Sequence, residues 1–113
     1  MHIASRCPFY RVLPSGHVLA YVPLATGEAV VLDAGDLARL ESLGISRNWH
    51  LAPTGLGYSY VRTAVDGQSR PVARLILDVP SGFRVRYRNG PLDLRRAALW
   101  IEERRKTRKP THP

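Results

Sequence analysis

Residues 73–101 read ARLILDVPSGFRVRYRNGPLDLRRAALWI, and this stretch decides the fold. Three arginines near its centre alternate with Val85 and Tyr87, which are side chains typical of a core. Successive side chains of an extended chain point to opposite faces, so a strand here would present all three arginines on one face. These arginines are Arg84, Arg86 and Arg88. The pattern therefore predicts a strand with one basic face and one core face.

The residues after this strand predict a tight turn followed by a helical turn. Asn89-Gly90 is a pair that readily adopts the left-handed conformations of a tight turn. Asp93 is a favourable N-cap for residues 94–99, which carry two further arginines, Arg95 and Arg96. The stretch as a whole therefore predicts a compact unit made of a strand, a turn and a short helix.

This order of parts resembles the core of phage-type HNH endonucleases. The frame of that core matches at Arg74, Leu75, Ile76, Leu77, Pro80, Gly82, Val85, Asn89, Gly90, Leu92, Asp93, Arg95, Arg96 and Leu99. The segment that precedes the core in the family matches at Val31, Asp33, Asp36, Leu40 and Trp49. The resemblance spans about residues 20–102, which is most of the chain. It implies an α+β domain that engages nucleic acid.

The catalytic residues of the family are replaced in this sequence. Arg86 and Tyr87 stand where the family has its metal-binding Asp and general-base His, Ala98 replaces the final Asn, and Ala73 replaces the opening His. An arginine repels a divalent cation, and a phenol with an ordinary pKa of about 10 is a poor base at neutral pH. We therefore expect no enzyme activity and no metal or other cofactor. Apetala-type DNA-binding domains share the frame and engage duplex DNA without cutting it.

The net charge of +8 is concentrated near the C-terminus. Residues 84–113 carry ten basic and three acidic side chains, whereas residues 1–83 carry seven basic and six acidic ones. Such asymmetry favours a polyanionic partner, most often nucleic acid. A solvated basic tail that only aids solubility is the alternative interpretation.

The composition argues against membrane, secreted and metal-binding proteins. The 113 residues, 44% of them hydrophobic, suit one folded domain, and no apolar run approaches the roughly 20 residues that span a bilayer. The N-terminus lacks the apolar segment of a signal peptide, and Cys7 is the only cysteine, so we expect a cytoplasmic protein without a membrane partner. The four histidines have no partner at metal-ligand spacing. They are His2, His17, His50 and His112.

The first half of the chain predicts a small sheet and one helix. Residues 1–16 form either a loosely attached arm or an edge strand, and residues 18–24 and 28–32 are typical of strands. Pro23 predicts an edge position for the first of these two strands. Asp33 is a good N-cap for an amphipathic helix over residues 34–43 that ends at Gly44.

The middle of the chain predicts two strands, over residues 48–52 and 58–64, and a hairpin turn at Asp66-Gly67. Tyr58, Tyr60 and Arg62 share one face of the second strand. They form either a stacking and phosphate-contact surface or a cap over the core with the hydroxyls at its rim.

Two segments of the second half leave the secondary structure open. Residues 72–76 fit a strand or a short helix, and the family resemblance favours a helical turn. Residues 95–106 fit one continuous basic helix, while residues 98–102 fit a closing strand; we favour a helical turn followed by a short extended stretch.

These observations predict an α+β fold: a small antiparallel sheet, an amphipathic helix and an HNH-like β-turn-α unit. We expect an N-terminal arm at residues 1–16, one HNH-like or Apetala-like domain at 17–103, and a disordered basic tail at 104–113. The expected function is DNA binding, with duplex DNA as partner, by an inactive phage or prophage protein derived from an HNH endonuclease. The alternatives are a protein-interaction module, such as a phage-encoded inhibitor that binds an acidic host protein, and a protein that binds RNA. The residues expected to contact nucleic acid are Arg84, Arg86, Arg88, Arg95, Arg96, Arg62, Tyr58, Tyr60, Arg104 and Arg105.

Overall fold

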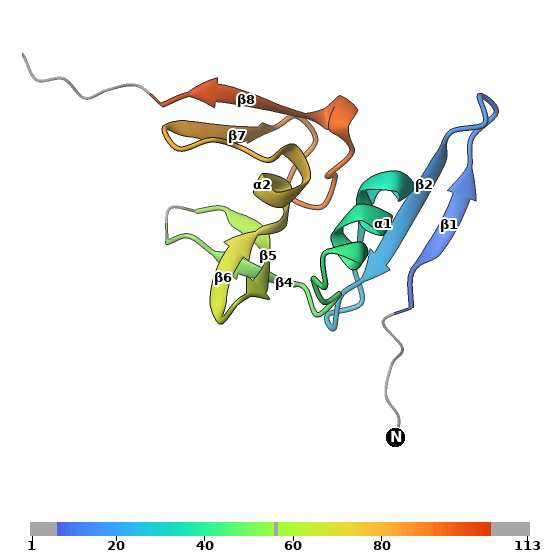
Figure 1. Ribbon diagram of the computed structural model, residues 1–113, viewed down its shortest axis with the longest axis horizontal. Helices are drawn as coiled ribbons and strands as arrows, with labels where there is room; N and C mark the ends of the chain where they lie inside the picture. The colour runs from blue at the N-terminus through green and yellow to red at the C-terminus, as the bar shows by residue number, and fades with distance from the viewer. Residues whose placement is uncertain (1–6, 56, 105–113) are drawn as a thin grey trace, which may run out of the picture.

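The computed structural model describes residues 7–55 and 57–104. Within these ranges the chain forms eight strands, two α-helices and one 3-10 turn, which confirms the predicted α+β class (Figure 1). The elements are β1 (Phe9–Val12), β2 (Val18–Pro23), β3 (Ala29–Asp33), α1 (Ala34–Ser42), β4 (His50–Pro53), β5 (Ser59–Val65), β6 (Gln68–Pro71), α2 (Val72–Leu77), β7 (Phe83–Tyr87), η1 (Arg96–Ala98) and β8 (Leu99–Glu103). No helix in the described part of the chain is long and apolar enough to cross a membrane.

The first sheet is antiparallel and has the order β1-β2-β3. Residues 9–12 are thus an edge strand, one of the two structures expected for the N-terminal segment, with exposed side chains throughout. The prediction that Pro23 places β2 at an edge is wrong, because β2 is the central strand. Pairing with β1 reaches only Tyr21, so the proline, which lacks an N–H, lies beyond the end of its neighbour.

Helix α1 follows β3 directly and packs against β2 and β3 (Figure 1). It begins after Asp33 and ends before Gly44, whose φ of 81° suits a glycine, so the predicted helix is confirmed. The Asp33 side chain makes no capping bond to α1. Its carboxylate instead accepts hydrogen bonds from His17 Nε2, at 2.6 Å, and from the backbone N–H of Arg96, at 3.0 Å.

The second sheet has the order β4-β5-β6 and leads without a loop into helix α2. Asp66 and Gly67 both have positive φ in the turn between β5 and β6, which confirms the predicted hairpin. Residues 72–77 are helical, as the family resemblance favours. Helix α2 packs against β5 and β6 and also touches α1, so it links the second sheet to the helix that packs on the first sheet.

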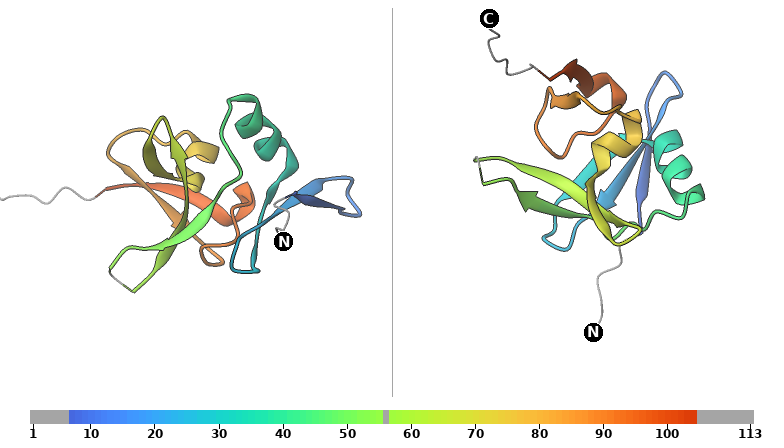
Figure 2. Two further views of the ribbon diagram at one scale, coloured as in Figure 1. Left: turned by 90° about the horizontal axis from the view of Figure 1, so that it is seen from below. Right: turned by 60° about the vertical axis from the view of Figure 1, so that its left-hand side comes forward.

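Strands β7 and β8 form a separate two-stranded ribbon. Residues 95–106 are not one basic helix: η1 is a single 3-10 turn, and β8 follows it, as our favoured interpretation expects. Asp93 does not cap a helix, since the position before η1 is Arg95. In the left-hand view of Figure 2, the β1–β2 hairpin projects from the molecule on the side opposite the end of β8.

One hydrophobic core connects the three sheets. Trp49 is its largest fully buried side chain, and buried residues come from both helices, from β2, β3, β5 and β7, and from the start of β8. Segment 92–94 joins the edge of β3: the Val31 N–H donates to the Leu92 carbonyl at 2.9 Å, and the Leu94 N–H donates to the Val31 carbonyl at 2.8 Å. This link fixes one end of the ribbon to the first sheet.

An ion pair ties the turn before β8 to helix α1. Arg96 Nε lies 2.9 and 3.1 Å from the two carboxylate oxygens of the buried Asp36. The same guanidinium donates to the Ile76 carbonyl at the end of α2, at 2.9 Å. A buried carboxylate must be compensated by hydrogen bonds and opposite charge, so this contact holds α1, α2 and η1 in one arrangement.

Replacing Asp36 with alanine should lower the free energy of unfolding by about 2 kcal/mol, because hydrogen bonds to charged groups are lost and Arg96 is left unpaired. Urea unfolding measures the change. Glu41→Ala breaks the solvent-accessible pair between Glu41 of the same helix and Arg47 of the segment that follows it; this matched control should cost under about 1 kcal/mol. Equal losses in the two variants would contradict a structural role for the Asp36–Arg96 pair.

Candidate nucleic-acid interface

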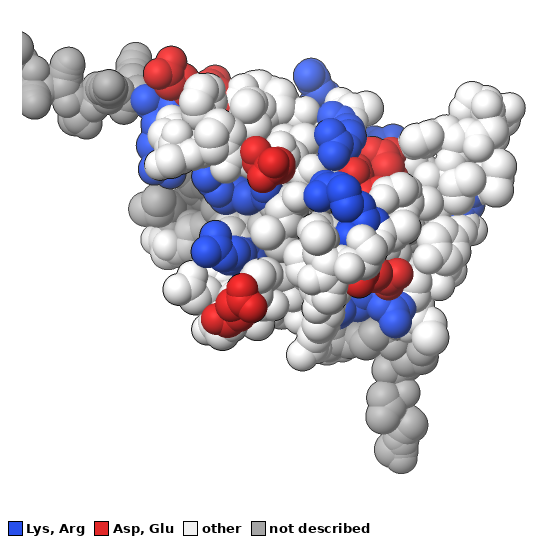
Figure 3. All heavy atoms as spheres, viewed as in Figure 1, with Lys and Arg blue, Asp and Glu red and all other residues white. Residues whose placement is uncertain are grey.

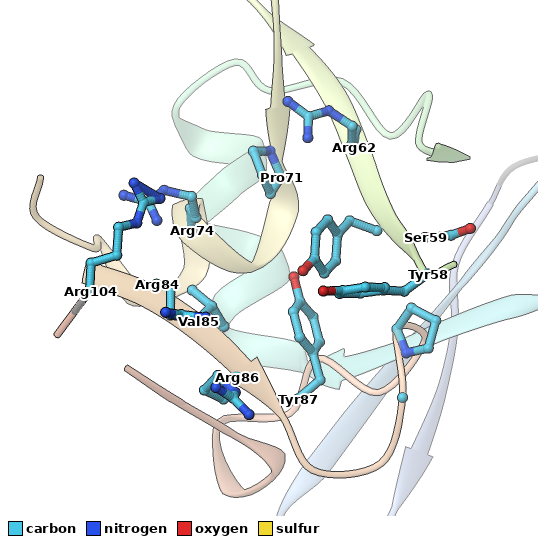
Figure 4. A pocket seen from close by; sticks show the side chains of 13 residues that line it. Tyr58, Ser59, Arg62, Pro71, Arg74, Arg84, Val85, Arg86, Tyr87 and Arg104 are labelled. Atoms are coloured by element: carbon cyan, nitrogen blue, oxygen red, sulfur yellow. The ribbon is translucent and has the colours of Figure 1, made fainter. Parts of the chain in front are cut away.

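A groove of about 560 Å³ lies between β5 and β7 (Figure 4). One face of β5 and the residue before it form one side, β7 forms the other, and the start of α2 and the end of β8 close it. We call this the tyrosine groove. The described residues that line it are Tyr58, Ser59, Tyr60, Arg62, Pro71, Arg74, Arg84, Val85, Arg86, Tyr87, Gly90, Pro91 and Arg104.

Five of the described arginines line the tyrosine groove, and no carboxylate is among its described lining residues. Two of the five bind neutral acceptors. Arg62 donates to the hydroxyl and the carbonyl of Ser69, and Arg74 donates to the carbonyls of Phe83 and Pro80. Neutral acceptors orient a guanidinium without cancelling its charge. Both side chains therefore still contribute positive potential to the groove.

The guanidiniums of Arg84 and Arg104 make no hydrogen bond or ion pair to any described residue. Both are exposed, and Figure 4 shows them with Arg74 at one end of the groove. Arg86 differs, because its Nη1 lies 2.8 Å from Glu102 Oε1 on the neighbouring strand. The two guanidiniums without a partner are thus the ones best placed to meet an incoming anion.

The three tyrosines of the groove contact one another. The rings of Tyr60 and Tyr87 stack, with centroids 5.3 Å apart, and Tyr58 meets Tyr60 edge-on at 6.0 Å. Tyr60 and Tyr87 are partly buried, whereas 53% of Tyr58 is exposed. The two interpretations left open by the sequence therefore apply to different residues: Tyr60 covers the core, and Tyr58 presents a ring to solvent.

Burial raises the pKa of the Tyr87 phenol far above its ordinary value, and the neighbouring Tyr60 adds to the effect. The phenol therefore stays protonated at neutral pH and can donate a hydrogen bond. It cannot act as a general base there.

The backbone of β7 faces the groove with an uncovered edge. The Arg88 N–H donates to the Ala98 carbonyl and the Arg104 N–H donates to the Gly82 carbonyl, so residues with even numbers bond to β8. Residues with odd numbers point their N–H and carbonyl groups the other way, into the groove.

Phe83 satisfies its groove-facing groups locally. Its N–H donates to the Pro80 carbonyl, and its carbonyl accepts from Arg74. For Val85 and Tyr87 no such backbone partner exists among the described residues. Two residues of β7 therefore offer donors and acceptors to whatever occupies the groove.

The predicted basic face of β7 is present. Arg84, Arg86 and Arg88 are exposed while Val85 is buried, and register places Trp100 and Glu102 of β8 on the same face. Arg88 lies over the Trp100 ring, 5.1 Å from its centroid. In space-filling view, basic atoms near the ribbon have acidic atoms scattered among them (Figure 3).

Arg95 and Arg96 are bound by carboxylates of the chain, whereas the sequence predicted them to be free for phosphate. Arg95 Nη2 lies 2.6 Å from Asp93 Oδ2, and this hydrogen bond lowers the pKa of Asp93 and raises that of Arg95. Arg96 is paired with Asp36, which raises its pKa in the same way. The geometry assigns these two arginines to the fold. Arg105 lies outside the described residues.

The structure adds one arginine that the sequence did not single out for binding. Arg74 matched only the family frame, but its place in α2 directs it to the groove (Figure 4). Ala73 and Ala98, which the resemblance stated above matches to catalytic positions of HNH enzymes, are buried. No three His, Cys, Asp or Glu side chains of residues 7–55 and 57–104 lie together as a metal site would require.

Comparison with known proteins found no match: no protein-family model, curated protein or solved structure resembles this chain significantly.

Tyr87→Phe should make stability less sensitive to alkaline pH. Folding raises the pKa of Tyr87, so its contribution to stability is complete below the ordinary value of about 10 and is lost as pH rises above it. In the wild type, this loss lowers the free energy of unfolding by up to about 1.4 kcal/mol per pH unit. The Tyr87→Phe variant has no phenol and should not show it. Urea midpoints at about pH 8 and about pH 11 test this. Tyr10→Phe, at an exposed position, is the control and should behave like the wild type.

Proposed function

We propose that this protein binds DNA without cleaving it, and that the tyrosine groove with its arginine rim is the contact surface. The observation that carries the proposal is the gathering of five arginines around one groove whose described lining residues include no carboxylate. Phosphates are the partners that such a surface selects, because Arg presents planar donors matched to their oxygens. The proposal also rests on the resemblance to HNH-like and Apetala-type domains, which favours a phage or prophage protein.

Arg84 and Arg104 make the principal phosphate contacts, since neither must leave a carboxylate first. Arg86 joins them after exchanging Glu102 for phosphate, and Arg88 extends the row along β7. Alternate residues of a strand lie about 7 Å apart, comparable to the spacing of successive phosphates along an extended strand. The row can therefore contact consecutive phosphates with little rearrangement.

The same residues support binding without hydrolysis. Hydrolysis by an HNH site needs a metal ligand and a base, and here Arg86 and a protonated Tyr87 occupy those positions. A cation at Arg86 favours the phosphate and disfavours the metal. The chain therefore retains attraction for the substrate of a nuclease while lacking the groups that activate water.

Arg84→Ala should weaken DNA binding and reduce its dependence on salt. Each phosphate contact contributes about 0.9 to the slope of log K against log salt concentration on B-form DNA, so the slope should fall by about that amount. Fluorescence anisotropy with a labelled duplex, from about 50 to 200 mM salt, measures it.

Arg11→Ala is the matched control, because Arg11 is exposed on β1, at the far end of the molecule, and has no ion pair within the described residues (Figure 1). This variant removes the same charge and should leave the slope nearly unchanged. Equal effects of the two substitutions would show that only net charge matters and would contradict the assigned surface.

Supercoiled plasmid incubated with the pure protein and magnesium should remain uncut. Agarose electrophoresis detects nicked and linear forms, with a magnesium-free sample as control. The proposal that the protein does not cleave DNA would be contradicted by magnesium-dependent nicking that co-purifies with the protein and that is altered in the Arg86→Ala variant.

A further inference from the structure

We infer that the tyrosine groove holds one unpaired strand of DNA, with a base stacked on Tyr58. The inference rests on the proposed DNA-binding function and specifies which form of DNA the groove accepts.

The shape of the groove favours a single strand. Base edges of duplex DNA are read by a helix or a ribbon that enters the major groove, and a hollow surface does not enter it. The tyrosine groove is instead a hollow of about 560 Å³ in the protein surface. That volume is within the range of clefts that bury small molecules, so unpaired bases of one strand can enter the groove.

Tyr58 has the properties of a stacking platform. Its exposed fraction is 53%, and its one ring contact among the described residues is the edge contact with Tyr60. Tyr60 in turn stacks on the partly buried Tyr87, so the platform is braced from the core. Aromatic rings in a basic groove bind unpaired bases in a sequence-tolerant manner.

The charges and the platform lie at different ends of the groove. Figure 4 shows Arg74, Arg84 and Arg104 at one end, with Tyr58 at the other. A strand lying along β7 would place phosphates among the arginines and a base on Tyr58. This separation of backbone contacts from a base contact is what a strand with splayed bases requires.

The free edge of β7 supplies polar contacts between the two ends. The N–H and carbonyl groups of Val85 and Tyr87 point away from β8, both residues line the groove, and these groups have no backbone partner in the described part of the chain. The edges of unpaired bases carry donors and acceptors that can bond to these groups, whereas in a duplex many of them are engaged in pairing. An acidic peptide could also pair with this edge as an added strand, which would be a different partner.

The test compares three labelled ligands of about 12 nucleotides at one salt concentration: oligothymidine, an abasic strand with the same phosphates, and a duplex. We expect oligothymidine to bind about tenfold more tightly than the abasic strand. Tyr58→Ala should abolish that difference and leave abasic binding unchanged, while Tyr58→Phe should keep it because the ring remains. Tyr10→Ala, which removes an equally exposed tyrosine from β1, should bind all three like the wild type.

Equal affinity for oligothymidine and the abasic strand, or tighter binding of the duplex than of either strand, would overturn the inference. DNA binding itself would then still be judged by the salt dependence of the Arg84→Ala variant. Absence of DNA binding, together with binding of oligoglutamate that Arg84→Ala weakens, would overturn both proposals and identify an acidic peptide as the partner.

Discussion

The ion pair between Asp36 and Arg96 is the constraint on which the arrangement of the sheets depends. It joins residues sixty positions apart, and the carboxylate is buried, so leaving it unpaired would be costly. The guanidinium also binds the end of α2 at the Ile76 carbonyl. Arg39 of α1 donates to the same carbonyl at 2.7 Å, so one backbone oxygen receives two cations from different elements. Helices α1 and α2 and the turn before β8 are thereby fixed together.

This anchoring explains why a groove exists. The ribbon is held at the end where segment 92–94 joins β3 and where Arg96 of η1 binds Asp36 of α1. Away from that end, β8 pairs with one edge of β7. The other edge of β7 is not paired with a strand, and β5 lies across the groove from it. If β5 were paired with β7, the two sheets would be continuous and the free N–H and carbonyl groups of β7 would be hydrogen-bonded to β5. Because they stay separate, these groups remain uncovered beside the three tyrosines.

Local patterns in the sequence predicted most elements, because period-two alternation, turn pairs and helix caps act over a few residues. The alternation of arginines with Val85 and Tyr87 predicted the exposed face of β7, and the Asp66-Gly67 pair predicted the β5–β6 turn. Partners were harder to predict. Asp93 looked like a helix cap, although its carboxylate binds the side chain of Arg95 two positions later, and nothing local marks Asp36 as the partner of Arg96. The lining of the groove was predicted in part for the same reason: Tyr58, Tyr60 and Arg62 share a strand face, whereas Arg74 reaches the groove through tertiary packing.

The position of the carboxylates, more than that of the arginines, determines where a polyanion can bind. Arginines follow one another along the last third of the chain, yet those at 95 and 96 are neutralised by Asp93 and Asp36. Those at 62 and 74 bind neutral carbonyl or hydroxyl oxygens and keep their charge. Opposite charges in close contact cancel at a distance, whereas a cation held by neutral dipoles does not. Arginines that keep their charge therefore gather around the groove containing the exposed ring of Tyr58, and no carboxylate is among its described lining residues.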